Sequence, residues 1–393
     1  MSIHYKFGGS TAGRTIKCPA WHNLAKNMPS GPASMAAMEG TLMHLLFERG
    51  VEDEEFEPAV MLGEMKIIDG QELYVKGEHI DKVYTALEEL EDIVSAYDYE
   101  YVLPEVIMNS DDETGGTADI IAYNMIAVGS DIVDNFGVHD LKTGDGYMVY
   151  AEGNEQLLFY AWQAVEKFKK KLTFTDNTLF QLGIIQPSDR RDDYTDVWET
   201  DLKTILNFGK VYKQAQKMAK AGIIAPCAGK HCAYCPAMST CPAKTGMVQV
   251  SQRIPSDSTE LVDLIKAMGI VDDVEDWCRA VRKTAHEQLE QGVDITGFKL
   301  VPKRAMRVWN DPTAALKKFK NARGLVAEDY LDMKLKSAPQ MEKACKAKGV
   351  DFKKFESMIS LHSSGTTLVK DSDSRTAVLP LASLAAMAAQ IKK

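Results

Sequence analysis

Two strand-like segments, followed by the first turns of a helix, constrain this chain more than any other feature. The apolar run at residues 116–122 contains one acidic residue, and residues 137–142 end in the pattern Asp-x-Lys. Because side chains alternate between the faces of a strand, Asp140 and Lys142 point the same way. Residues 156–160 then carry Gln and Tyr one helical turn apart. These segments predict an α/β fold in which polar side chains from two strands and a helix meet at one sheet edge.

The residue types at that edge are typical of a metal site that cleaves phosphodiesters. If Asp119 ends the neighbouring strand, two carboxylates and one ammonium group converge, and carboxylate oxygens suit Mg²⁺ or Mn²⁺. Such an ion can activate water, while Lys142 can stabilise charge in the transition state. Gln156 and Tyr160 share a helix face and can position the substrate. The catalytic residues predicted are therefore Asp119, Asp140, Lys142, Gln156 and Tyr160.

Each motif alone also has a structural interpretation. Residues 140–146 can be a strand running into a polar turn, because Gly and Asp are common turn residues. Asp119 can cap a loop, and His44 can be a histidine in a half-buried helix. The order and spacing of the whole set favour the catalytic interpretation.

In this order the motifs resemble the RecB-like branch of the PD-(D/E)XK nucleases, which includes iron–sulfur enzymes. Residues 39–44 look like the family's N-terminal helix with a metal-binding histidine, His44, and Glu105 matches an acidic residue on the strand before Asp119. The resemblance covers residues 14–245. It implies a restriction-endonuclease-like core, which is a mixed central sheet flanked by helices. It also implies that Mg²⁺ or Mn²⁺ is held by His44, Asp119, Asp140 and the carbonyl of Leu141.

The cysteines give a second signal. Of the seven in the chain, Cys232, Cys235 and Cys241 form the pattern C-x2-C-x5-C, and proline follows Cys18 and two of these three. No secretory leader is evident, which favours a reducing cytoplasm where clustered cysteines usually bind metal. The family resemblance implies that Cys18 joins Cys232, Cys235 and Cys241 around a [4Fe–4S] cluster, forming a clasp at the rim of the core.

The alternative is a structural zinc site with Cys227 or His231 as a local fourth ligand, because zinc sites use similar spacings. Cys278 and Cys345 lie in helical patterns and are predicted to be small core residues.

Length and periodicity predict two domains in the 393 residues: a nuclease domain with the cysteine cluster at 1–250 and an α+β accessory domain at 251–393. Polar residues 251–258 would form the linker between them. Helices are expected at 33–49, 71–97, 151–171, after 201, and at 261–291, 314–320, 338–348 and 379–391. Strands are expected within 101–142, at 179–186 and from 298 to 309.

The net charge of −10 does not exclude a nucleic-acid partner, because a basic groove can form on an acidic protein. Basic residues gather at 167–171 and 299–323, and the second group includes Lys299, Lys303, Arg304 and Arg307. Those cations, with Trp309 among them, predict a DNA-binding surface in the C-terminal domain, although a solvated helix face is the simpler interpretation of any single charge run.

The resemblance implies a metal-dependent DNA exonuclease of the bacterial cytoplasm, similar to phage and prophage enzymes of recombination, repair or replication. Its partners would be single-stranded DNA or duplex ends and a single-strand-binding or annealing protein, with no membrane. Two alternatives stay open: a catalytically silent DNA-binding or assembly subunit of the same fold, and a ribonuclease.

Overall fold

The structure is a computed structural model that describes residues 5–28, 33–188, 193–222, 224–253, 260–301, 345 and 351–353. The chain divides into two compact units, Met1–Arg304 and Ala305–Lys393. Nearly all described residues belong to the first unit.

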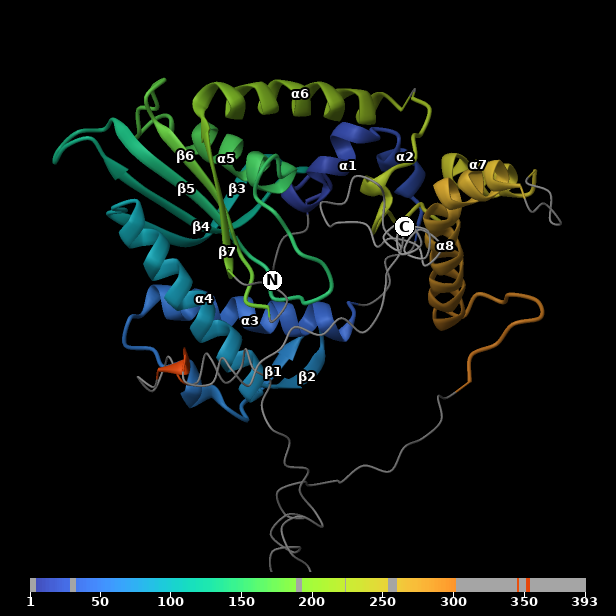
Figure 1. Ribbon diagram of the computed structural model, residues 1–393, viewed down its shortest axis with the longest axis horizontal. Coiled ribbons are helices and arrows are strands. Elements are labelled where there is room, and N and C mark those ends of the chain that lie inside the picture. Colours follow the sequence, from blue (N-terminus) through green and yellow to red (C-terminus); the bar gives the residue numbers. More distant parts are fainter. Residues whose placement is uncertain are drawn as a thin grey trace, which may run out of the picture. The chain divides into compact units, whose positions relative to one another are not determined.

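A mixed five-stranded sheet forms the centre of this unit (Figure 1). Its first three strands make an antiparallel meander, the next pairs in parallel with the third, and the last is again antiparallel. The strands in spatial order are β3 (Tyr101–Asp111), β4 (Thr114–Met125), β5 (Val133–Leu141), β6 (Leu179–Ile185) and β7 (Thr195–Asp201). Parallel pairing requires a crossover connection, and α5 (Glu155–Phe168) lies in the one between β5 and β6.

Helices cover both faces of the sheet and enclose two cores (Figure 1). On one face lie α5, α6 (Leu202–Ala221) and α1 (Ala12–Lys17), and on the other α3 (Met35–Glu52) and α4 (Gly77–Ala96). In α6 the buried side chains Ile205, Phe208, Tyr212, Ala215 and Ala219 recur every three or four residues, which places them on one helix face. The α/β class predicted from the sequence is confirmed, with a mixed sheet flanked by helices.

Smaller elements complete the unit. The ribbon of β1 (Met65–Ile68) and β2 (Gln71–Tyr74) packs beside α3. The remaining helices are α2 (Trp21–Ala25), α7 (Pro242–Ser251), α8 (Leu261–Glu290) and the 3₁₀ turns η1 (Gly9–Thr11), η2 (Pro58–Met61) and η3 (Lys230–Cys232). Among the described residues, none of these helices has the length and apolar character needed to cross a bilayer.

Several sequence-based boundaries need correction. The helix expected at 71–97 begins at Gly77, because residues 71–74 pair with β1 as a strand. The strand β7 was not expected at all. Residues 298–301, the described part of the strand expected at 298–309, are irregular. The helices expected at 314–320 and 379–391, and nearly all of the one at 338–348, lie outside the described residues.

The division into compact units does not fall at the expected domain boundary, residue 250. The helix α7 continues through that position to Ser251. The helix α8 packs against α7, and its Trp277 donates a hydrogen bond to the carbonyl of Ser239, in the loop before α7. Whether residues 305–393 form an α+β accessory domain stays a prediction.

The contact between β5 and β6 is tight enough to test. Gly183 pairs with His139, whose imidazole is fully buried and whose pKa burial lowers to about 4. A Cβ atom at Gly183 would collide with Nδ1 of that ring. Gly183→Ala should therefore lower the free energy of unfolding by ~1–3 kcal/mol, measured by urea denaturation. Gly77→Ala is the control, because a Cβ there meets nothing within 4 Å, and an equal loss in both variants would contradict this packing.

Candidate active site and cysteine pocket

The register of the sheet brings the two predicted aspartates together. Ile120 of β4 pairs with His139 of β5, so that Asp119 and Asp140 occupy neighbouring positions on adjacent strands. The Oδ2 atom of Asp119 accepts a hydrogen bond of 2.7 Å from the backbone N–H of Leu141. This bond fixes the carboxylate of one strand at the end of the other.

Asp140, Lys142 and Gln156 form one closed network. The Oδ1 atom of Asp140 accepts a hydrogen bond of 2.7 Å from Nε2 of Gln156, and its Oδ2 atom lies 2.5 Å from Nζ of Lys142. That Nζ also donates to Oε1 of Gln156 at 3.1 Å. Asp140 is 3% exposed, whereas the Lys142 side chain keeps 27% of its surface accessible. The ammonium group is therefore held by two partners on a side chain that stays partly accessible.

The helix α5 supplies Gln156 from its first turn. Asn154 caps this helix, because its side-chain oxygen accepts hydrogen bonds from the N–H groups of Gln156 and Leu157. One turn further on, Tyr160 lies over two glycines, and a Cβ atom at Gly116 would lie only 3.0 Å from Cε1 of its ring. Gly116, three residues before Asp119, therefore makes room for the ring of Tyr160.

His44 and Glu105 complete the acidic cluster. His44, on α3, places Nδ1 3.4 Å from Oδ1 of Asp119. Ligand atoms of His44, Glu105 and Asp119 all lie within 4.8 Å of one another. Glu105 faces Asp119 across the β3–β4 pair, in a left-handed backbone conformation with φ of 46°. Such a conformation is strained for a non-glycine residue, and strain of this kind concentrates at functional sites.

Burial and the neighbouring charges in this cluster shift the pKa values of its members. Burial lowers the pKa of His44, but the carboxylates of Asp119 and Asp140 outweigh it and raise the value to about 9. Burial, together with the charge of Asp119, raises the pKa of Glu105 to about 7. Burial likewise raises the pKa of Asp140, although Lys142 opposes the shift. An added cation would relieve the repulsion among these carboxylates, so that the donor set suits a hard divalent metal ion.

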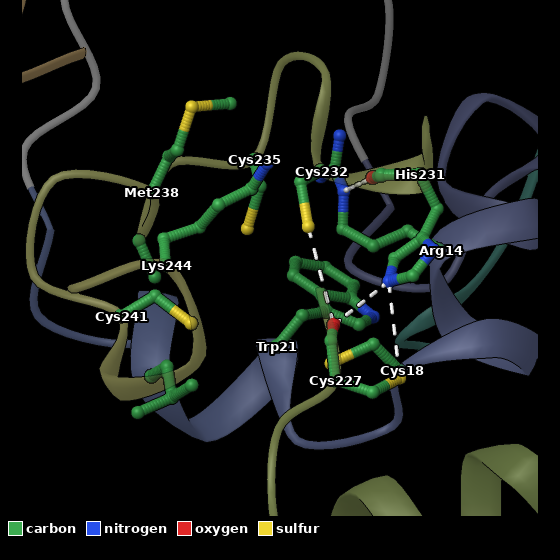
Figure 2. Close-up of a pocket in the computed structure, with 12 residues that line it drawn as sticks. Arg14, Cys18, Trp21, Cys227, His231, Cys232, Cys235, Met238, Cys241 and Lys244 are labelled. Atoms are coloured by element: carbon green, nitrogen blue, oxygen red, sulfur yellow. Dashed lines mark hydrogen bonds between the residues drawn. The ribbon is translucent and has the colours of Figure 1, made fainter. Parts of the chain in front are cut away.

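Six potential soft ligands line one pocket between α1, α2 and the loop that leads into α7 (Figure 2). They are Cys18, Cys227, His231, Cys232, Cys235 and Cys241. Burial raises the pKa of the thiols of Cys232 and Cys235. Because a metal ion binds the thiolate, a bound metal would reverse that shift.

Both sequence-based ligand sets meet in this pocket. The set Cys18, Cys232, Cys235 and Cys241 lines it, as does the local alternative with Cys227 and His231. Ligand atoms of Cys18, Cys227 and His231 lie within 4.8 Å of one another. Ligands of a single tetrahedral zinc ion are about 3.8 Å apart for Zn–S bonds of about 2.3 Å, so this triad has the spacing of a mononuclear site.

One half-buried cation, Arg14, and one buried cation, Lys244, border the pocket, and sequence reasoning missed both. Arg14 donates hydrogen bonds to the carbonyls of His231 and Ala233, at 3.4 and 3.2 Å, and burial lowers its pKa. Lys244 is 1% exposed and pairs with Asp273 of α8. A single basic residue in a helical pattern carries no signal of such burial.

Cys278 is half-buried on α8, and Cys345 is buried, as predicted for a small core residue.

A third group, formed by Glu39, Glu78 and His79, is occupied by a cation of the chain itself. Nζ of Lys76 lies 2.5 Å from Glu39 and 3.4 Å from Glu78. Nδ1 of His79 accepts the backbone N–H of Lys76. This group is therefore explained by ion pairing.

The described residues thus define an α/β protein with one candidate metal-binding group rich in carboxylates and another rich in thiols. The chain belongs to the family described as "Protein of unknown function (DUF2800)", whose model matches residues 4–376. Among solved structures it is similar to a protein from Eubacterium rectale described as a putative exonuclease. The TM-score is 0.28 and the sequence identity 7%, over 50% of this chain and 71% of that one.

Proposed function

We propose that this protein is a metal-dependent nuclease of the RecB-like PD-(D/E)XK type that degrades DNA from its ends in a bacterial cytoplasm. One observation carries the proposal: the network of Asp140, Lys142 and Gln156 lies beside the group of His44, Glu105 and Asp119. A binding module has no need to place a buried and a half-buried aspartate, together with a partly accessible lysine, between two interior strands and the helix α5. The cost of burying such charges is expected where they carry out chemistry.

The proposed metal ligands are His44, Glu105, Asp119 and Asp140, together with the carbonyl of Leu141. A bound Mg²⁺ or Mn²⁺ ion would lower the pKa of water and polarise the phosphoryl oxygen. Gln156 holds Asp140 and Lys142 in fixed relative positions by donating to one and accepting from the other. Lys142 can then stabilise negative charge on the phosphoryl group or orient the attacking water.

For the cysteine pocket we propose a [4Fe–4S] cluster on Cys18, Cys232, Cys235 and Cys241. Cysteines from two distant segments, residue 18 and residues 232–241, line one pocket there. Arg14 and Lys244 line the same pocket and can balance the negative charge of a thiolate-bound centre. The close approach of Cys18, Cys227 and His231 favours a second candidate, a mononuclear zinc site. In either case the centre is structural and holds α1 and α2 against the loop before α7.

The function is tested by the products of digestion. With Mn²⁺ or Mg²⁺, the purified chain should degrade linear DNA and leave a covalently closed circle of the same sequence intact, because an exonuclease requires an end. Excess EDTA should abolish cleavage. Gel analysis of end-labelled single- and double-stranded DNA, with RNA of matched sequence, distinguishes the alternatives.

Three outcomes would contradict the proposal in different ways. Rapid cutting of closed circular single strands would identify an endonuclease, and preferred cleavage of RNA a ribonuclease. Binding of DNA without cleavage in the presence of any of these metal ions would identify a catalytically silent binding or assembly subunit.

The DNA surface proposed at Lys299, Lys303, Arg304 and Arg307 lies outside the described residues except for the exposed Lys299. A steep loss of affinity as salt rises would support an electrostatic surface of this kind.

A further inference from the structure

The segment that joins the two halves of the candidate active site carries two exposed aromatic rings. Residues 143–154 connect Lys142, at the end of β5, to Gln156, in the first turn of α5. Within this loop the side chains of Tyr147 and Tyr150 are 78% and 64% exposed. A tyrosine ring offers a large apolar face together with a polar hydroxyl group, a combination that is enriched where proteins bind partners. Two of them in the connection between two active-site residues call for a functional explanation.

A buried glutamine holds the backbone beneath these rings. Gln186, directly after β6, is 1% exposed, and its side chain makes three hydrogen bonds to the loop. Its Nε2 group donates to the carbonyls of Gly144 and Tyr147, at 2.8 and 2.9 Å. Its Oε1 atom accepts the N–H of Val149 at 3.0 Å. The loop is therefore fixed on both sides of Tyr147.

Two further side chains fix the ends of the loop. Nζ of Lys82, on α4, donates to the carbonyl of Thr143 and to Asp145, both at 2.8 Å. Oδ2 of Asp196, on β7, accepts the N–H of Ala151 at 2.8 Å, and Ala151 itself is fully buried. Anchors from α4, β6 and β7 thus hold the backbone of the loop, while both tyrosine side chains remain mostly exposed.

We propose that Tyr147 and Tyr150 form a platform on which unpaired bases of the substrate stack next to the metal site. This inference rests on the proposed nuclease function and names the substrate class as single-stranded DNA. Aromatic side chains bind every base through its π face, and a rigid loop reduces the ordering that binding requires. Bases within a duplex already stack on one another, so that the platform engages only an unpaired strand.

The test measures binding separately from cleavage. The full-length protein is titrated in Ca²⁺ with fluorescein-labelled oligo(dT) and with a labelled blunt duplex, and affinity is read from fluorescence anisotropy. The double variant Tyr147→Ala/Tyr150→Ala should bind oligo(dT) at least about tenfold more weakly, with its duplex affinity unchanged. Tyr147→Phe/Tyr150→Phe should bind like the parent, because it keeps both rings. Tyr74→Ala removes an exposed ring from β2 and serves as the matched control.

A second readout locates the contact directly. On irradiation, an oligonucleotide that contains 5-iodouracil should become crosslinked to peptides that include Tyr147 or Tyr150. Unchanged oligo(dT) affinity in the alanine variant, an equal loss in the phenylalanine variant, or crosslinks confined to other peptides would each overturn the platform. If the chain cleaves no DNA but the alanine variant still loses oligo(dT) binding, the nuclease proposal fails and the platform stands. If the chain cleaves DNA and the alanine variant binds oligo(dT) normally, the platform fails and the nuclease proposal stands.

Discussion

Substituting Asp119→Asn, Asp140→Asn or Lys142→Met should each lower the rate of DNA cleavage by at least about 10²-fold, while the fold is retained. Loss of one group that stabilises the transition state typically costs this much. Asparagine keeps the size of the side chain and one acceptor oxygen, which can still face Leu141 or Gln156, but it removes the charge and replaces the second oxygen with an NH2 donor. Single-turnover cleavage of end-labelled DNA at saturating Mn²⁺ measures the effect, and circular dichroism verifies the fold.

Asp134→Ala is the matched control for these variants, because Asp134 is an exposed carboxylate on the same strand, β5. It should cleave at the parental rate. Near-parental cleavage by Lys142→Met would remove the network from the mechanism. A loss shared by Asp134→Ala would point to general damage to β5 instead of chemistry.

Removal of a single cysteine ligand should abolish metal binding in the cysteine pocket. We expect anaerobically purified protein to be brown and to carry about four irons per chain, as a cubane cluster requires. Because Cys18 belongs both to the proposed cluster and to the triad of Cys18, Cys227 and His231, Cys18→Ser should lose the metal in either case. Retention of the metal in this variant would favour zinc held by Cys232, Cys235 and Cys241 with a local fourth ligand. The discriminating pair is Cys241→Ser, expected to lose the cluster, and Cys227→Ser, expected to keep it. Metal analysis and visible absorption provide the measurement.

The opposite pattern would establish the zinc alternative. Colourless protein with stoichiometric zinc, lost in Cys227→Ser and kept in Cys241→Ser, would place the ion at Cys18, Cys227 and His231. Cys278→Ser serves as the control in both cases, because Cys278 is a half-buried residue of α8 that does not line the pocket.

Strand period and helix period sufficed to predict the neighbourhood of Asp119, Asp140 and Gln156. Both periods act locally, although burial is continuous from Phe136 to Leu141 and from Leu157 to Val165, and Asp119 lies within β4 and not at its end as expected. By contrast, β7 has the sequence Thr-Asp-Val-Trp-Glu-Thr-Asp and lies at the sheet edge, where partial exposure weakens the apolar alternation that identifies a strand. The segment of β2 was read as helix because four residues are too few to reveal either period.

Other parts of the site depend on information that no local pattern carries. The role of Glu105 depends on a single left-handed backbone conformation. The approach of Cys227 to Cys18 and the burial of Lys244 against Asp273 depend on how distant segments pack. Gln186 looked like the end of a buried strand, and its three hydrogen bonds to the loop at 143–154 become visible only in three dimensions.

The cysteine pocket also sets an order of events during biosynthesis. Its walls come from α1 and α2, near the start of the chain, and from residues 227–244, so that the entire central sheet lies in the connection between them. Contacts so distant in sequence form slowly, because a long loop must close first. A chain emerging from the ribosome can therefore complete the sheet before the pocket exists. Until residues 227–244 have been translated, Cys18 lacks the wall that they form, and the first thiol synthesised is among the last to be enclosed.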